Sequence, residues 1–182
     1  RRPHRAWLAA SLLILAAGLP SSAAAQTVVS LSPDVTIALG AGDLVTADHA
    51  VAVDNQLDIV VLQNLGAIPD SADVVAYAEG PGTRRLLAFD TTVSLVGGVV
   101  ARPGDVAALN GGTYSIVFSA SSVGLPPGVI VDAVAVSSAG GLLLSFDTAV
   151  SLPGGLHVAD EDLVRWNGSV FSLALDGSSA GI

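Results

Sequence analysis

Acidic side chains are the groups in this 182-residue sequence that could most readily do chemistry, because 16 Asp and Glu face only 7 basic residues and no Cys is present. The densest group is Asp160, Glu161 and Asp162, directly ahead of an expected strand. Calcium prefers several oxygen ligands of this kind. The cluster is therefore a candidate calcium site, with a solvated acidic loop as the alternative. No other cofactor is indicated.

Other aspartates recur along the chain. Asp90 and Asp147 follow one expected strand, and Asp105 and Asp162 open another. Aspartates at strand ends usually accept hydrogen bonds from nearby backbone N–H groups and shape the turn. Because a catalytic site needs only one copy, this recurrence favours a structural role.

Nucleophilic catalysis has little support in the sequence. Residues 177–181 match the G-x-S-x-G pattern of a nucleophile elbow, which requires a strand, a sharp turn and then a helix. His157 precedes the motif serine, whereas the hydrolase order places the histidine after it. His49 and His157 also lack the spacing of paired metal ligands. Enzymatic activity is left open, and these features favour a non-catalytic protein.

The chain repeats itself, and the repeats must position these residues. Residues 86–125 and 143–182 align without a gap at an offset of 57, with 17 identical positions. A more divergent copy precedes them. We therefore divide the chain into a leader and three repeat units. The leader is 1–25, and the units are 26–72, 73–131 and a truncated 132–182, with continuation expected beyond Ile182.

Each unit has the signals of four short strands. In the last unit they are expected at 132–136, 142–146, 163–166 and 170–175, with a longer loop around Pro153. Asn167-Gly168 predicts a type I′ hairpin. Period-two spacing predicts Phe171, Leu173 and Leu175 on one large apolar face, with small residues opposite. Such a sheet suits stacking on another copy of itself.

The first twenty-five residues have the layout of a secretory signal peptide. A basic start is followed by an apolar run of about 14 residues and a small-residue tract ending at Ala25. That run is shorter than the roughly 20 residues that span a bilayer. We expect a signal helix that is removed, a mature chain without a membrane span, and a secreted, extracellular or cell-surface location, with the periplasm as the alternative.

Three segments carry a resemblance: LLLSFDT at 142–148, DEDLVRWNG at 160–168 and FSLALDGSSAGI at 171–182. They resemble a repeat of secreted bacterial β-propeller-like proteins of uncharacterised function. The resemblance implies an all-β fold of tandem four-stranded antiparallel meanders, like incomplete propeller blades. A β-sandwich is the alternative. In a propeller, Asp73 and Asp132, each expected to open a first strand, would lie near the axis, which makes them candidate ligand-binding residues.

These features favour a secreted non-catalytic β-repeat protein for surface display, adhesion or ligand binding. The alternatives are a fragment of a secreted propeller-type hydrolase or lyase, and a calcium-stabilised extracellular module. Removing the leader leaves four arginines against the 16 acidic residues, so no basic surface is available for a nucleic acid. The expected partner is an extracellular ligand or surface component.

Overall fold

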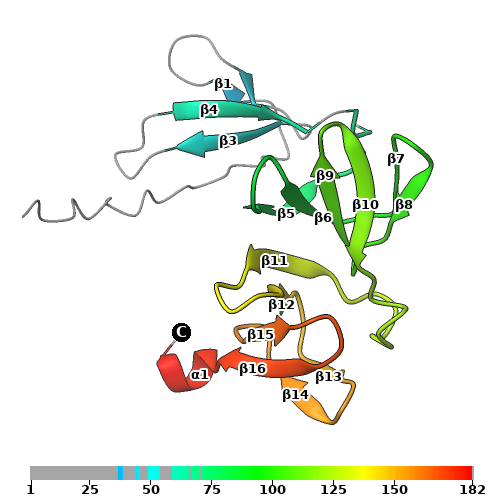
Figure 1. Ribbon diagram of the computed structural model, residues 1–182. Helices are drawn as coiled ribbons and strands as arrows, with labels where there is room; N and C mark the ends of the chain where they lie inside the picture. Colours follow the sequence, from blue (N-terminus) through cyan, green and yellow to red (C-terminus); the bar gives the residue numbers. More distant parts are fainter. Residues whose placement is uncertain are drawn as a thin grey trace, which may run out of the picture.

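The structure is a computed structural model, and it describes residues 37–38, 44–45, 49–53, 59–65, 67–69 and 71–181. The predicted signal peptide lies outside the described residues, as does much of the first predicted unit. The described residues are almost entirely β-structure, with one four-residue helix near the C-terminal end (Figure 1). None of the described helical structure is long and apolar enough to cross a bilayer.

Sixteen strands and one helix are described. Their bounds are β1 Ile37–Ala38, β2 Leu44–Val45, β3 His49–Val53, β4 Ile59–Asn64, β5 Val74–Glu79, β6 Arg85–Phe89, β7 Val93–Leu95, β8 Val99–Ala101, β9 Val106–Asn110, β10 Thr113–Phe118, β11 Val131–Val136, β12 Leu142–Phe146, β13 Val150–Leu152, β14 Leu156–Val158, β15 Leu163–Trp166, β16 Phe171–Leu175 and α1 Gly177–Ala180.

Two four-stranded antiparallel sheets form the main body of the described structure. We number the two sheets after the second and third predicted units, to which they correspond. Sheet II has the order β5-β6-β9-β10, and sheet III has the order β11-β12-β15-β16. A small hairpin interrupts each meander, β7-β8 in sheet II and β13-β14 in sheet III. The predicted all-β fold of tandem four-stranded antiparallel meanders is confirmed. The expected long loop around Pro153 is instead the turn of the β13-β14 hairpin.

The two sheets are built from residues at a constant spacing. β5 begins at Val74 and β11 at Val131, 57 residues later, and the next four strands along the chain, β6 to β9, keep that spacing to β12 to β15. Both first strands carry a bulge at the same place, between Val74 and Ala76 in sheet II and between Val131 and Ala133 in sheet III. The aligned stretches therefore share strand order, register and irregularities.

Bulges in the last strands change the predicted faces. Val164 lies opposite Leu173, but Leu163 lies opposite Leu175, because the register shifts between the two pairs. Leu175 therefore leaves the face that it was predicted to share with Phe171 and Leu173. The prediction of one continuous large face failed because a bulge reverses the alternation of side chains.

Turn geometry also differs in part from expectation. At the β9-β10 hairpin, Asn110 still pairs with Thr113, and the two central residues are Gly111 and Gly112, with φ of 55° and 83°. Two positive φ angles are what a type I′ turn requires. In sheet III the connection is longer, and the side chain of Asn167 accepts hydrogen bonds from backbone N–H groups at 169 and 170.

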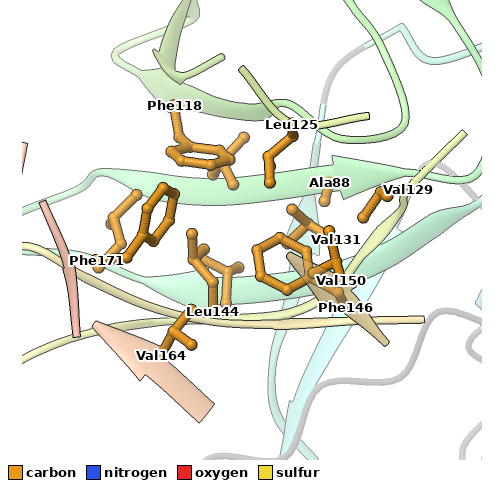
Figure 2. Close-up of a cluster of buried hydrophobic side chains, with 14 of the residues drawn as sticks. Ala88, Phe118, Leu125, Val129, Val131, Leu144, Phe146, Val150, Val164 and Phe171 are labelled. Carbon is orange, nitrogen blue, oxygen red and sulfur yellow. The ribbon is translucent and has the colours of Figure 1, made fainter. Parts of the chain in front are cut away.

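Sheet III stacks on sheet II, with β11 against β5 and β6. Figure 2 shows side chains from both sheets meeting in one apolar cluster, including Ala88 and Phe118 of sheet II and Leu144 and Phe171 of sheet III. Fully burying a Leu or Phe side chain stabilises a fold by about 1.5–3 kcal/mol. The predicted stacking of one unit on the next is thus the main packing contact between the sheets.

Sheet II is buried on both faces. Along β6, Leu86 and Ala88 point into the cluster shared with sheet III, while Leu87 and Phe89 point into a second cluster that includes Leu65. Strands buried on both faces read as continuous apolar runs, which explains the sequence Leu86 to Phe89. On sheet III, the residues that match Ala76 and Ala78, namely Ala133 and Ala135, are exposed.

Candidate functional site

Asp105 and Asp162 are structural clamps in equivalent places. Asp105 accepts the backbone N–H of Arg102 at 3.0 Å and that of Ala120 at 2.9 Å. Asp162 accepts the N–H groups of Ala159 at 2.9 Å and Gly177 at 3.0 Å. Each carboxylate thereby joins the start of the third strand to the chain that leaves the fourth. The predicted structural role of these aspartates is confirmed.

Asp90 and Asp147 do the same at the start of each sheet. The backbone N–H of Asp73 donates to Asp90 Oδ1, and that of Ile130 donates to Asp147 Oδ1, both at 2.8 Å. Each bond ties the residue before the first strand to the residue after the second strand. The sequence reading of these two aspartates as strand-end acceptors agrees with these contacts.

Two of the three acidic side chains at 160–162 are engaged in hydrogen bonds. Both oxygens of Asp162 are engaged by backbone N–H groups, Glu161 accepts a hydrogen bond from the hydroxyl of Ser178, and Asp160 is exposed. Within the described part of the chain, no group of three or more Asp, Glu, His or Cys side chains is placed to hold a metal ion. Calcium binding by Asp160, Glu161 and Asp162 stays a prediction.

The two candidate ligand-binding aspartates do not occupy equivalent positions. Asp73 precedes β5 and matches Ile130, whereas Asp132 lies within β11 and matches Val75. Asp132 accepts a hydrogen bond from the hydroxyl of Ser145 at 2.5 Å. Matching Asp73 to Asp132 by residue type implies an offset of 59 residues. The bulge that both first strands share sets the offset at 57, so the two aspartates are two residues out of register. Ligand binding by Asp73 and Asp132 stays a prediction.

The G-x-S-x-G segment forms the short helix α1 and its C-terminal cap, at the end of the described chain. Asp176 caps α1, its carboxylate accepting the backbone N–H of Ser179 at 2.8 Å, and this hydrogen bond lowers the pKa of Asp176. The Nδ1 of His157 lies 2.7 Å from the hydroxyl of Ser151, an exposed cross-strand neighbour. The hydrogen-bond partner of His157 is thus Ser151 and not the motif serine.

Neither tyrosine supplies a phenolate at neutral pH. Burial is the main cause that raises the pKa of Tyr77 to about 12, and the charge of Glu79 adds to it. Burial also raises the pKa of Tyr114, whose hydroxyl donates a hydrogen bond to the carbonyl of Leu65. Tyr114 thus fastens sheet II to the segment that precedes it.

The most site-like feature of the described structure is an aromatic cluster where the two sheets meet. Trp166 and Phe171 are cross-strand neighbours in sheet III, with ring centroids 4.6 Å apart. Phe118 of sheet II meets both rings edge-on, at centroid distances of 5.9 and 6.0 Å. Edge-on aromatic pairs at this separation are favourable beyond their burial. The cluster holds the ends of β10, β15 and β16 together.

Two cavities flank Trp166, and together they form what we call the Trp166 cleft. The larger has a volume of about 570 Å³ and is lined by the three aromatic rings and by Ser119, Ser122 and Ser169, among others. The smaller, of about 250 Å³, lies between Trp166 and the β5-β6 turn, where Arg84 lines it. The larger volume is within the range of about 300–1,000 Å³ that is usual for ligand pockets.

Local backbone geometry fixes the position of Trp166. Gly141, in the β11-β12 turn, has a φ of 82°, and a Cβ atom there would overlap the carbonyl oxygen of Trp166. Only glycine tolerates both the left-handed conformation and the close approach. The turn therefore presses against the end of β15, and Gly141 and Trp166 both line the smaller cavity.

Sequence reasoning did not single out the Trp166 cleft. Trp166 belongs to the quoted segment 160–168, but the cleft combines it with Phe118 and Ser122 from the preceding unit. A signal was present, since Trp166 is the single tryptophan after residue 25 and adjoins the Asn167-Gly168 turn.

Comparisons with protein-family models, curated proteins and solved structures gave no match to this chain.

Proposed function

We propose that this chain is a secreted, non-catalytic β-repeat protein that acts in surface display, adhesion or ligand binding, and that it binds through the Trp166 cleft. The single observation that carries the proposal is the cleft itself, where aromatic rings and hydroxyl groups from two stacked sheets surround one half-buried tryptophan. Aromatic side chains with a polar rim are typical of binding sites.

Several sequence features support export and display. The N-terminal residues have the layout of a signal peptide. The acidic composition favours solubility of the exported protein. The quoted segments resemble repeats of secreted bacterial proteins. The recurring aspartates are occupied in holding backbone N–H groups. The chemistry-bearing residues that recur thus serve the scaffold, which leaves binding as the activity that the geometry supports best.

Adhesion of the exported chain to intact bacterial and host-cell surfaces tests this proposal. Ser122→Arg places a long side chain in the cleft from an exposed position and leaves the aromatic core in place. Ser179→Arg is the matched control, because Ser179 lies 57 residues later, is exposed and does not line the cleft. We expect Ser122→Arg to reduce adhesion and the control to retain it. Equal adhesion by both variants would refute the cleft as the binding site.

A further inference from the structure

We infer that the ligand of the Trp166 cleft is a neutral saccharide, an inference that rests on the proposed binding function. The larger cavity is lined by the rings of Phe118, Trp166 and Phe171 and by serine hydroxyls, and none of the described residues that line it is charged. A ligand that matches this surface has an apolar ring face, several hydroxyl groups and no net charge.

Stacking explains the apolar half of the match. A pyranose ring presents a face of C–H groups, which can lie on an aromatic ring as other apolar groups do. Trp166 is half-buried and lines both the larger and the smaller cavity. The indole of Trp166 also packs against the rings of Phe118 and Phe171. The Trp166 side chain therefore has little conformational freedom left to lose on binding.

Hydrogen bonding explains the polar half. The hydroxyl of Ser122 can donate and accept, as sugar hydroxyls do. Ser169 already donates to Asn167 Oδ1, and the hydroxyl of Ser119 is 3.3 Å from that of Ser121, so each of these two oxygens can still accept a hydrogen bond. Asn167 lines the smaller cavity, and its amide NH2 can donate there, because its Oδ1 already accepts hydrogen bonds from Ser169 and Val170. A hydroxyl-rich ligand can hydrogen-bond to the capacity that these groups still have, whereas an apolar ligand would leave that capacity unused when water is expelled.

Charge disfavours anionic ligands in the larger cavity. The chain carries a net charge of −9. Arg84 is the one charged side chain at the cleft among the described residues, and it lines the smaller cavity but not the larger one. Burying a charged group without a partner is costly. Uronate-rich, sulfated or phosphorylated ligands are therefore disfavoured in the larger cavity.

Hydrolysis of the bound sugar is not expected. Glycosidases use two Asp or Glu side chains on either side of the scissile bond. Within the described structure, neither cavity of the Trp166 cleft is lined by a carboxylate. The inference is thus of a saccharide-binding cleft that holds its ligand unchanged.

Titration with defined oligosaccharides tests the inference. The probes are cellohexaose, xylohexaose and mannohexaose, with hexagalacturonate and a heparin hexasaccharide as anionic counterparts. The full chain with Trp7→Phe leaves Trp166 as the only tryptophan, so its emission reports on the cleft, and calorimetry gives the Kd. We expect at least one neutral probe to shift the emission and bind. Ser122→Arg should weaken binding at least tenfold, and Ser179→Arg should leave it unchanged.

The two proposals fail in different ways. If no neutral probe binds, or if an anionic probe binds as tightly, the ligand class is wrong. If the Ser122→Arg variant nevertheless loses adhesion to surfaces, the proposed binding function stands with another ligand. If a neutral probe binds but Ser122→Arg binds it as tightly as the parent chain, the assignment of this ligand to the cleft is overturned.

Discussion

Asp105 and Asp162 make the same pair of hydrogen bonds in two different sheets. Each carboxylate accepts one backbone N–H from three residues earlier in the chain and another from fifteen residues later. Each bond uses a charged acceptor, which makes it stronger than a neutral hydrogen bond. The repeated aspartate thus links the start of the third strand of each sheet to the segment that follows the fourth strand.

Replacing Asp105 should destabilise the fold strongly. Asp105 is 2% exposed, so Asp105→Ala leaves two backbone N–H groups without their acceptor in a region with little water. Hydrogen bonds to charged groups contribute about 1.5–3 kcal/mol each, and we expect a loss of about 3 kcal/mol in the free energy of unfolding, measured by urea denaturation. Asp160→Ala, at an exposed position in the acidic cluster, is the control and should change it by less than about 0.5 kcal/mol. Similar losses in both variants would contradict the clamp.

Two adjacent glycines should respond differently to the same substitution. Gly140 and Gly141 both have positive φ, of 86° and 82°, but a Cβ would meet no atom at Gly140 and the backbone of Trp166 at Gly141. Gly140→Ala should cost about 1 kcal/mol for its conformation alone. Gly141→Ala adds a backbone overlap and should cost clearly more, which paired thermal melts can measure. Equal melting temperatures for the two variants would count against the close approach.

Phe118 should contribute more stability than its counterpart in sheet III. Phe118 is 2% exposed between the two sheets, whereas Leu175, 57 residues later, is 37% exposed. Phe118→Ala should lower the free energy of unfolding by about 3–5 kcal/mol, as large core deletions do. Leu175→Ala should cost about 1 kcal/mol because much of its surface stays in water. If the order of the two costs were reversed in denaturant titrations, the stacking of the sheets would be wrong.

Alkaline pH should weaken the fold through its two tyrosines. Burial raises the pKa of both Tyr77 and Tyr114, that of Tyr77 to about 12 from 10.0. Above about pH 10 the unfolded chain releases phenol protons that the folded chain keeps, so the stabilising contribution is complete below that pH. It is lost as the pH rises towards 12. Urea denaturation between pH 9 and 12 should show this decline, and Tyr77→Phe should make it shallower. A decline of unchanged steepness in Tyr77→Phe would remove Tyr77 as its source.

Local signals in the sequence were enough to predict the four strands of each main sheet, but not the β7-β8 and β13-β14 hairpins. The expected segments 142–146 and 163–166 coincide with β12 and β15, because glycine turns and runs of β-branched and apolar residues mark short strands. The aspartate clamps were predictable for a similar reason, since a short carboxylate side chain reaches only nearby backbone N–H groups.

The faces of the last strands and the cleft could not be predicted in this way. A bulge between Leu173 and Leu175 reverses the alternation, and nothing in the residue types announces it. The Trp166 cleft depends on how far one sheet is displaced over the other, because Phe118 and Trp166 come from different units. Packing between distant segments sets that displacement, and a single repeat pattern does not contain it.

Contact between the rings of Phe118 and Trp166 tests the central claim most directly, because the cleft exists only if sheet III stacks on sheet II in the described way. Proton NMR of the chain with Trp7→Phe, which leaves one tryptophan and adds a fifth phenylalanine to the native four, can detect cross-relaxation between ring protons. The account predicts cross-peaks from the Trp166 indole to Phe171 within its own sheet and to Phe118 across the interface. Cross-peaks to Phe171 with none to Phe118 would contradict the stacking and, with it, the cleft.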